Sequence, residues 1–552
     1  MKRLVVLLIV ACMLFGCQAK DNSASKKVDS GEFKVTAKGM YGEFDITFTT
    51  KDNAITAIEV GENKETAAVG GKAIAIMIDR IIEENSIDVD LVSGATVTSS
   101  GFRSAMESGL EKANASEAFF TSDKEIKKTA ETVDTEVLVI GAGAAGFSAA
   151  IKAAQNGAKV TLIEKQDIIG GSTLISAGIV YAALDESDMN VMQEYYVNRA
   201  EGDVDLELLK TYVDSSINNI EFLESVGVKW LMKVPSGTAL EPRAHFSVDD
   251  NGLSFSGAVL INALEEKAKE LNIQILTGVE ATELVKDSNG AVVGAKASSK
   301  TVDYTFNTKS VVLATGGYDS NKQMKEEYAP SIADEFPLSS KGNTGDGIKM
   351  GVAVGADTVF KGGSIGFVSV HPTLSNSGQS GIAMGASYYV LPDGSYGSDK
   401  VDYPITHTAI NKAGVEFFYG LFDKSGAETA QLAVDLGYGY KADTIEELAT
   451  LSKMDVNKLK ESMTKNNSLK EGPYFAIEVR PTTIGTMGGL KVNTKSEVLT
   501  STGTAIPGLY AAGEVANGDL YNVEYPASGT SISMSITYGL IAGEQAAQHS
   551  KK

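Results

Sequence analysis

A glycine-rich turn between a strand and a helix is the feature that most constrains this sequence. Residues Thr135 to Ile140 form an apolar strand that runs directly into Gly141-Ala-Gly-Ala-Ala-Gly146, and a helix follows from Phe147 to Asn156. Glycine lets such a turn close and lets the backbone approach a pyrophosphate, whose charge the helix N-terminus stabilises. The next strand, Lys159 to Ile163, ends in Glu164, which is placed to hydrogen-bond a ribose hydroxyl. The pattern predicts a doubly wound α/β domain that binds a dinucleotide.

The chain of 552 residues is long enough for several domains. Apolar and polar residues alternate at 33–37 and 44–48, which is typical of a hairpin, and a strand at 55–60 and helices at 74–82 and 102–113 complete a small α+β domain. The remainder is long enough for the doubly wound domain to be interrupted by an α+β capping domain. The expected boundaries are a tether at 18–30, the small α+β domain at 31–116, a charged linker at 117–132, the doubly wound domain at 133–365 and 486–549, and the capping domain at 366–485.

Residues 1–17 read as a targeting segment and not as part of the fold. Lys2 and Arg3 precede an apolar run from Leu4 to Leu14, which is shorter than the ~20 residues that a membrane span needs. The tetrapeptide that ends at Cys17 resembles a bacterial lipobox, which implies cleavage before Cys17 and attachment of lipid to it. We therefore expect an extracytoplasmic protein that a lipid anchor holds at the cell membrane.

Cysteine usage and charge exclude several classes of partner. Cys12 would leave with the targeting segment and Cys17 would carry the lipid, so the mature chain would contain no thiol. This excludes a disulfide, a thiolate metal site and a Cys-x-x-Cys-His haem attachment, and we expect no metal site. The net charge of -22 argues against nucleic acid or anionic lipid as a partner.

The heptapeptide Asp90-Leu-Val-Ser-Gly-Ala-Thr96 ends in a hydroxyl flanked by small residues, so a second protein can approach it closely. It resembles the flavinylation motif of FMN-binding domains, and every specified position matches. The resemblance implies that a flavin transferase attaches FMN to Thr96 through a phosphoester, with Asp90 as part of the same site. The alternative interpretation is a polar turn without a ligand, because the segment is rich in turn residues.

Four more glycine-rich segments follow the first turn, at 170–173, 314–317, 344–347 and 508–514. Together and in this order they resemble the FAD-binding elements of the fumarate reductase flavoprotein family, over residues 133–549. The segment at 170–173 has no histidine, so the resemblance implies non-covalent FAD. The residues expected at the cofactor are Gly141, Gly143, Ala145, Gly146, Glu164, Lys165, Gly171, Ser172, Thr173, Gly178, Thr315, Gly316, Asp346, Gly513, Glu514, Ser531 and Ile532.

The two flavins suggest an electron relay. In some members of that family a haem domain feeds electrons to FAD, and this chain has no haem motif. We expect FMN on Thr96 to take that place and to pass electrons to FAD. A relay implies a source, and for an anchored protein the expected source is a membrane electron-donor protein or a quinone-linked chain.

The resemblance also implies the chemistry, which is hydride transfer from flavin to an activated C=C bond and protonation of the neighbouring carbon by a protein acid. Fumarate-specific members use a histidine in a His-Pro-Thr segment, which His371 matches, and an arginine donor, which is absent. By register from His371, His407 stands near the missing donor, and Tyr388, Tyr389 and Tyr403 are alternative acids. The other interpretation of His407 is a surface histidine in a loop.

The late arginine of the family is missing too, and Arg243 and Arg480 are the only arginines after residue 199. A planar guanidinium is the preferred partner of a substrate carboxylate, so its scarcity argues against a dicarboxylate. In its place stands Tyr525-Pro-Ala-Ser-Gly529, which resembles the 3-ketosteroid dehydrogenases, whose Tyr hydroxyl and Gly N–H bind a ketone oxygen. Two such donors stabilise an enolate as an oxyanion hole does. The alternative is a tyrosine packed against the flavin, with the proline in a turn.

We therefore expect an ene-reductase with two flavins. Its substrate would be small, neutral and hydrophobic, with a C=C bond conjugated to a carbonyl or a phenol, as in a steroid enone or a plant phenylpropenoid. The nearest alternative is a carboxylate reductase of urocanate, cinnamate or fumarate type, anchored by Arg243 or Arg480. A second is a 3-ketosteroid dehydrogenase-like enzyme that runs in the oxidative direction. Alternatives of other classes are an electron-transfer lipoprotein with a vestigial FAD domain, and a flavin-binding or assembly protein without redox turnover.

Overall fold

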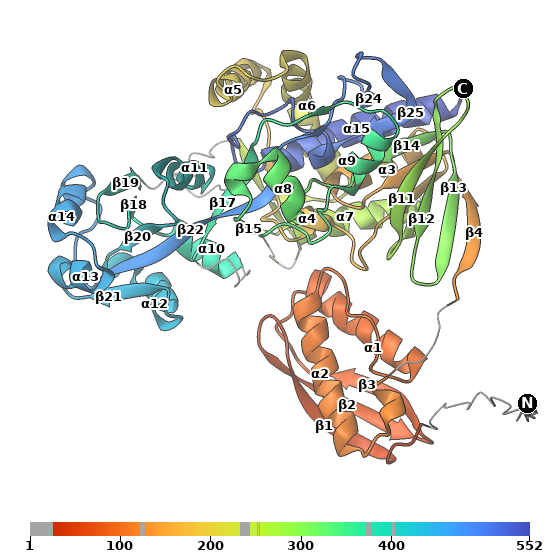
Figure 1. The fold of residues 1–552 in the computed structure, drawn as a ribbon, viewed down its shortest axis with the longest axis horizontal. Helices are drawn as coiled ribbons and strands as arrows, with labels where there is room; N and C mark the ends of the chain where they lie inside the picture. The colour runs from red at the N-terminus through yellow and green to blue at the C-terminus, as the bar shows by residue number, and fades with distance from the viewer. Residues whose placement is uncertain are drawn as a thin grey trace, which may run out of the picture. The chain divides into compact units, whose positions relative to one another are not determined.

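The computed structural model describes residues 26–121, 127–231, 243–250, 252, 254, 256–370, 377–399 and 403–552. These residues form two compact units, one ending at residue 121 and one beginning at residue 127, and both are drawn in Figure 1. The predicted targeting segment and His371 lie outside the described residues. None of the helices in the described part combines the length and the apolarity that a membrane crossing needs.

The first unit is a three-stranded antiparallel sheet with two helices (Figure 1). Along the second strand Phe44, Ile46 and Phe48 are buried while their neighbours are not, which is the alternation of a sheet with one covered face. The helix that begins at Thr96 packs against the first strand and starts earlier than the sequence pattern indicated. The elements are β1 (Gly31–Lys38), β2 (Glu43–Lys51), β3 (Ala54–Val60), η1 (Ala67–Gly71), α1 (Lys72–Glu84), α2 (Thr96–Lys112) and η2 (Glu117–Phe119).

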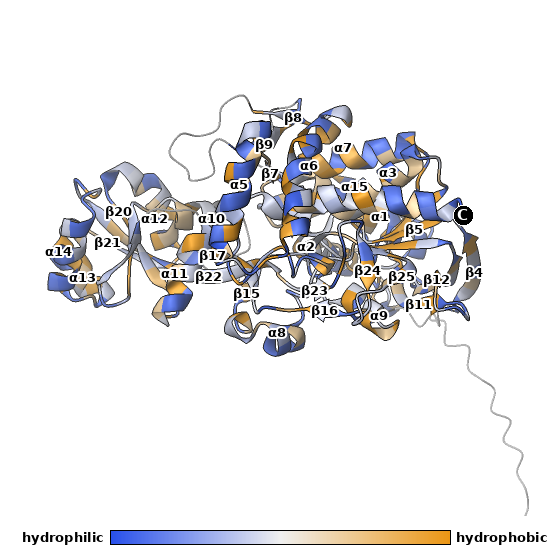
Figure 2. Cartoon of the chain, turned by 90° about the horizontal axis from the view of Figure 1, so that it is seen from above, coloured by the Kyte–Doolittle hydropathy of each residue, from blue (hydrophilic) through white to orange (hydrophobic). Residues whose placement is uncertain are grey.

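A six-stranded sheet organises the second unit, in the order β10-β6-β5-β14-β25-β24. Its first five strands are parallel and its last pair is antiparallel. Strands β5, β6 and β14 are buried along their whole length, as expected for parallel strands that are covered on both faces, and Figure 2 shows β5 as hydrophobic. The strands are β5 (Val137–Ile140), β6 (Val160–Ile163), β10 (Gln274–Leu276), β14 (Ser310–Leu313), β24 (Glu497–Leu499) and β25 (Ala505–Ala511).

Two layers cover this sheet. On one side α3 (Ala144–Gln155) and α15 (Thr530–Ser550) pack on each other and on the strands, with α7 (Gly257–Glu270) beside α3. On the other side, strand β12 of a four-stranded sheet packs on β14 and β25. That sheet has the order β11-β12-β13-β4, with β11 (Glu280–Lys286), β12 (Val292–Ser298), β13 (Val302–Asn307) and β4 (Thr129–Asp134). The predicted doubly wound α/β fold is confirmed.

The segment between the two parts of the doubly wound fold forms a cap around a seven-stranded sheet. Helices lie on both faces of its central strands, so two hydrophobic clusters are separated by the sheet. The strands are β15 (Phe336–Pro337), β17 (Ser364–Ser369), β18 (Tyr388–Val390), β19 (Tyr396–Asp399), β20 (Phe418–Phe422), β21 (Gly439–Ala442) and β22 (Tyr474–Thr486). The helices are α10 (Ser377–Met384), α11 (Tyr403–Ala413), α12 (Ala427–Asp435), α13 (Ile445–Ser452) and α14 (Val456–Lys465).

Smaller elements complete the second unit. They are α4 (Gly171–Leu174), β7 (Ile179–Tyr181), α5 (Glu186–Arg199), α6 (Leu206–Ser225), β8 (Lys229–Trp230), β9 (Ala244–Val248), α8 (Lys322–Tyr328), η3 (Pro330–Ile332), α9 (Asp346–Ala353), β16 (Thr358–Val359), β23 (Gly489–Leu490) and η5 (Gly513–Val515). Residues 117–132 were expected to be a linker, but both ends of this stretch belong to the folded units. Phe119 is fully buried in the first unit, and residues 129–132 belong to strand β4, which pairs with β13.

Candidate active site

The glycine turn joins β5 to α3 as the sequence predicted. Gly141 has φ 104°, which favours glycine, and Gly143 is the N-cap of α3. A Cβ on Gly146 would lie 1.8 Å from the Gly141 carbonyl oxygen, so no larger residue fits there. The cap residue supplies no side chain to the first turn of α3, and Thr173 accepts only the Ala144 N–H, so the N–H of Ala145 lies at an anion-binding helix N-terminus.

Glu164 lies directly after β6 and its carboxylate faces this turn. Its two oxygens accept hydrogen bonds from the N–H groups of Ala142 and Gln166, both at 2.9 Å. Burial raises the pKa of Glu164, and these N–H groups act against the rise. The ribose contact predicted for Glu164 stays a prediction, and its position beside the glycine turn is the one that such a contact requires.

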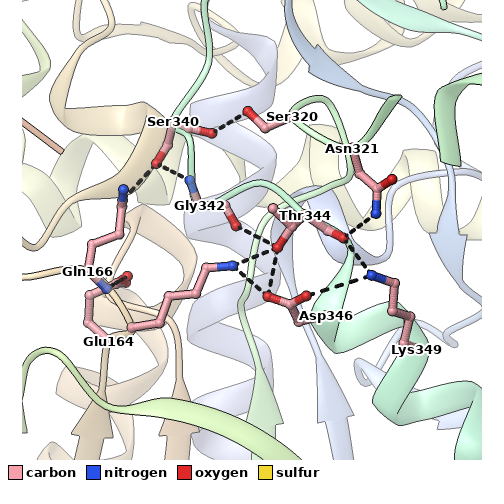
Figure 3. A network of polar contacts seen from close by, with 10 residues as sticks. Glu164, Gln166, Ser320, Asn321, Ser340, Gly342, Thr344, Asp346 and Lys349 are labelled. Carbon is pink, nitrogen blue, oxygen red and sulfur yellow. Dashed lines mark hydrogen bonds and ion pairs between the residues drawn. The ribbon is translucent and has the colours of Figure 1, made fainter. Parts of the chain in front are cut away.

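A polar network joins the loop after β6 to the loop before α9 (Figure 3). Lys165 Nζ lies 2.5 Å from Asp346 Oδ2 and 2.7 Å from Thr344 Oγ1. Gln166 accepts a hydrogen bond from Ser340, at 2.7 Å. Burial opposes ionisation of Asp346, but Lys165 and Thr344 outweigh it and lower its pKa. Lys165 and Asp346, both expected at the cofactor, are thus brought together from segments 181 residues apart.

A second cluster centres on Glu514, just after β25. Its Oε1 accepts the Thr486 N–H at 2.6 Å and its Oε2 accepts the Asn343 amide at 3.2 Å. The same Asn343 amide reaches Ser172 Oγ at 3.3 Å, so two expected cofactor residues meet through a residue that the sequence did not single out. Burial raises the pKa of Glu514 to about 7.

These residues fit a dinucleotide on structural grounds. The Thr315 hydroxyl is buried and hydrogen-bonded to none of the described residues, which is costly unless a ligand satisfies it. Thr173 Oγ1 accepts the N–H of Ala144 in the first turn of α3, at 3.3 Å. An anion site at a helix N-terminus, an unpaired hydroxyl and two carboxylates therefore surround the carboxyl ends of β5, β6, β14 and β25, where open α/β sheets bind ligands.

Tyr525 and Gly529 lie at the N-terminus of α15. Tyr525 is buried, and its hydroxyl oxygen accepts a hydrogen bond from the Ser531 N–H at 2.7 Å. Burial raises its pKa well above the ordinary value, with Tyr521 and Tyr403 adding to the rise, so Tyr525 stays protonated. Gly529 is the N-cap of α15 with φ 88°, and among the described residues none accepts its N–H. Because the hydroxyl oxygen of Tyr525 accepts a hydrogen bond from Ser531, its proton can be donated to another group.

The three arginines of the second unit each face a carboxylate. Arg243 holds Asp188 with both ends of its fork, at 2.7 and 2.5 Å, and this pairing raises its pKa. Arg480 lies 2.9 Å from Glu478. Arg199 lies 3.1 Å from Glu524, the residue before Tyr525. Each positive charge thus has a carboxylate nearby, but the buried Nε and Nη2 of Arg199 are hydrogen-bonded to none of the described residues.

His407 is a buried residue of α11, and this corrects the interpretation of it as a surface histidine in a loop. Its Nε2 lies 2.8 Å from Glu335 Oε2, and Asn411 donates to the other oxygen of the same carboxylate at 2.8 Å. Sequence reasoning missed Glu335, because nothing near it in the chain marks it.

The tyrosines proposed as alternative acids separate into two groups. Tyr388 bonds to Ser462 at 3.1 Å and Tyr389 donates to the Ala383 carbonyl at 3.0 Å, both inside the cap. Strand β18 has a hydrophobic cluster on each face, so both residues are core residues, and the prediction of Tyr388 as a catalytic acid is wrong. Tyr403, in the first turn of α11, is the one that neighbours Tyr525.

Thr96 is the first residue of α2 and its side chain is exposed. Ala95 precedes it as N-cap without a side-chain hydrogen bond, so the first N–H groups of the helix are available to a phosphate. Glu65 braces this turn, because its carboxylate accepts Thr98 Oγ1 at 2.5 Å and the Tyr41 N–H at 3.0 Å. The geometry fits FMN at this helix end.

Comparison with known proteins agrees with both cofactor assignments. Residues 136–532 match the FAD binding domain and residues 39–111 match the FMN-binding domain. Urocanate reductase of Eggerthella lenta is 28% identical over 96% of this chain and 95% of its own length. Vinyl phenol reductase of Lactiplantibacillus plantarum is 28% identical over 75% of this chain and 96% of its own length.

A solved structure of similar fold is the open conformation of a flavocytochrome c3 fumarate reductase, with a TM-score of 0.60 and 28% identity over 76% of this chain and 79% of that one. The predicted resemblance to the fumarate and urocanate reductases is confirmed. The chain belongs to the FAD-binding oxidoreductases that reduce C=C bonds, and an FMN-binding domain precedes its FAD-binding domain.

Proposed function

We propose that this protein is an extracytoplasmic ene-reductase for neutral alkenes whose C=C bond is conjugated to a carbonyl or a phenol. The observation that carries the proposal is the hydrogen bond from the Ser531 N–H to the Tyr525 hydroxyl oxygen, 2.7 Å long. It fixes a protonated, neutral tyrosine at the N-terminus of α15, the helix whose N-cap is Gly529. Two neutral donors at a helix N-terminus suit an oxygen that gains negative charge during the reaction.

In this proposal the Tyr525 hydroxyl and the Gly529 N–H bind the carbonyl or phenol oxygen of the substrate. Bound FAD supplies a hydride equivalent to one carbon of the C=C bond. The charge that develops on the substrate oxygen is stabilised by the two donors, which need no reorganisation because Ser531 and the α15 N-cap hold them. A protein acid then gives a proton to the other carbon.

Two of the three arginines of the second unit support a neutral substrate. A substrate carboxylate binds best to a guanidinium with free donors. Arg243 and Arg480 donate hydrogen bonds to Asp188 and Glu478, so binding a carboxylate through either of them requires breaking an ion pair or adding a second negative charge to it. Arg199 forms an ion pair with Glu524, but its buried Nε and Nη2 donate to none of the described residues.

A tyrosine substitution tests this assignment. We expect Tyr525→Phe to slow reduction of a neutral enone about 100-fold or more under anaerobic conditions with reduced viologen, because one oxyanion donor is lost. The matched control is Tyr388→Phe, which also removes a buried, hydrogen-bonded hydroxyl but lies in the cap. Equal rates for the two variants would overturn the role of Tyr525.

We further propose that FMN is bound covalently to Thr96 by a flavin transferase and relays electrons to FAD. A membrane electron-donor protein or a quinone-linked chain would supply them, with lipid on Cys17 as the anchor. Exposure of Thr96 at the start of α2 supports the attachment. In a denaturing gel, flavin fluorescence should disappear in Thr96→Ala and persist in Ser104→Ala, an exposed hydroxyl on the same helix. Loss of membrane association in Cys17→Ser tests the anchor.

A carboxylate reductase of the urocanate type is the second candidate. The observation that favours it is the match to urocanate reductase over nearly the whole of both chains, flavin domains included. It predicts turnover of urocanate or cinnamate, and little effect of Tyr525→Phe on that turnover. The same two variants therefore separate the candidates.

A further inference from the structure

One face of helix α11 links the substrate site to a carboxylate of the FAD-binding fold. Tyr403, His407 and Asn411 are four residues apart and share this face. At one end Tyr403 lies near Tyr525, whose pKa it helps to raise. At the other end Asn411 and His407 both contact Glu335, which lies between η3 and β15.

The two ring nitrogens of His407 have different surroundings. Nε2 faces Glu335 Oε2 at 2.8 Å and Asn411 at 3.3 Å. Nδ1 is hydrogen-bonded to none of the described residues, and it lies over Gly366 of β17. A Cβ at Gly366 would come within 2.1 Å of Nδ1, so this glycine makes room for the ring. One nitrogen is therefore held by Glu335, and the other packs against Gly366 without a hydrogen bond to a described residue.

Glu335 is itself held firmly. Asn411 donates to its Oε1 at 2.8 Å, so both carboxylate oxygens are used by α11. The buried Lys325 donates to its backbone carbonyl at 2.7 Å. Asp319 lies 3.7 Å from the same lysine. The carboxylate of Glu335 is therefore fixed against the imidazole, as the carboxylate of a catalytic triad fixes its histidine.

We propose that Glu335 is the positioning residue that makes His407 the proton donor of the reduction. This rests on the proposed function. Glu335 fixes the ring through Nε2–H, and the proton on Nδ1 is the one that His407 would give to the substrate. Hydride from reduced flavin adds to one alkene carbon, and the electron pair displaced to the other carbon takes the Nδ1 proton to form the second C–H bond. His407 is left neutral with its Nε2–H on Glu335, and a proton from solvent restores it.

The isosteric variant Glu335→Gln removes the charge and keeps one acceptor, so the amide oxygen can still accept from Nε2–H while the acceptor for Asn411 is lost. Stopped-flow measurements separate two steps, reduction of FAD by viologen and reoxidation of the reduced enzyme by a neutral enone. We expect the first step to keep its rate and the second to slow by about 10- to 100-fold, with unchanged enone affinity. The matched control is Asp334→Asn, a neighbouring exposed carboxylate paired with Lys322, which should behave as wild type.

A double variant distinguishes positioning from a general structural effect. If Glu335 acts through His407, Glu335→Gln should slow His407→Asn no further, since the two residues act as one unit. Glu335→Asp, which keeps the charge, should recover part of the rate and serves as the test if the glutamine variant folds poorly. Reoxidation of Glu335→Gln within about two-fold of wild type, or full additivity with His407→Asn, would overturn the proposal.

The test of Glu335 and the test of the substrate proposal can fail independently of each other. If the wild-type enzyme reduces only carboxylates, the substrate proposal fails, and the same reoxidation step measured with that carboxylate still tests Glu335. If the enone is reduced and Glu335→Gln is unaffected, the substrate proposal stands and the positioning role fails.

Discussion

Lys412 of α11 forms an ion pair with Glu524, with 2.7 Å between Nζ and Oε1. Glu524 directly precedes Tyr525, and its other oxygen lies 3.1 Å from Arg199 at the end of α5. One carboxylate thus ties the cap helix that carries His407 to the loop that carries Tyr525. The ion pairs of Glu524 therefore connect the two elements that carry His407 and Tyr525, the residues proposed to act on the substrate.

We expect Glu524→Gln to lower the free energy of unfolding by about 1–3 kcal/mol, because it leaves the largely buried Arg199 without its counter-charge. Lys412→Met should cost less than about 1 kcal/mol, since that lysine is mostly exposed. Denaturant unfolding of both variants measures the difference. Equal losses would show that Arg199 does not depend on Glu524.

The raised pKa of Glu514 predicts how stability depends on pH. A carboxyl group with a pKa of about 7 in the folded protein holds its proton more tightly than in the unfolded chain. Its contribution is therefore fully present below the unfolded pKa of about 4.3 and is lost as pH rises through 7. For the flavin-free protein, the stability of wild type relative to Glu514→Gln should fall between pH 5 and 8, by a few kcal/mol at most. A constant or rising difference in thermal unfolding would contradict the burial of Glu514.

Two glycine variants separate folding from cofactor binding at the turn after β5. Gly146→Ala should destabilise even the flavin-free protein by about 3 kcal/mol or more, since its Cβ would collide with the Gly141 carbonyl. Gly143→Ala meets nothing closer than 3.9 Å, so the flavin-free fold should persist. If the pyrophosphate approaches this backbone, the Gly143 variant should nevertheless lose FAD. FAD content and melting temperature are measured for both variants. Normal FAD content in Gly143→Ala would show that the pyrophosphate does not lie against this turn.

Glu65 is expected to matter for flavin attachment at Thr96. Its carboxylate fills the space above Gly39 and Gly70, where a Cβ would lie 2.4 and 2.1 Å from it. Glu65→Ala should loosen the first turn of α2 by removing the contact to Thr98, at a cost of about 1–3 kcal/mol. The fraction of protein with covalent flavin should fall with it. Glu62→Ala, an exposed neighbour, is the control, and equal flavin content in both variants would argue that Glu65 has no part in attachment.

The local parts of the fold could be predicted from the sequence. The glycine turn, the acid at the end of β6 and the alternating strands of the first unit each depend on residues close in the chain. Their order along the chain identified the family. What could not be predicted are contacts between distant segments, such as Glu335 with His407, 72 residues apart, and Asn343 with Ser172, 171 apart.

The error at Tyr388 has a specific cause. Tyr388 was predicted as an alternative acid to His407, but β18 is an inner strand whose two faces are both covered. Tyr388 and Tyr389 therefore enter opposite cores, and neither side of the strand faces a ligand. Tyr403 is not on this strand. It lies in the first turn of helix α11, near Tyr525.

The most direct test of the central claim compares two substrates of nearly the same shape. Benzylideneacetone and cinnamate share a styryl group bonded to a carbonyl carbon. They differ in that this carbon belongs to a methyl ketone in the first and to a carboxylate in the second. We expect reduced wild-type enzyme to be reoxidised by the ketone at least about 100-fold faster under anaerobic conditions. The reason is that two neutral donors suit the ketone oxygen, while Arg243 and Arg480 are already hydrogen-bonded to carboxylates of the protein. Faster reoxidation by cinnamate, undiminished in Tyr525→Phe, would contradict the account and assign the enzyme to the carboxylate reductases.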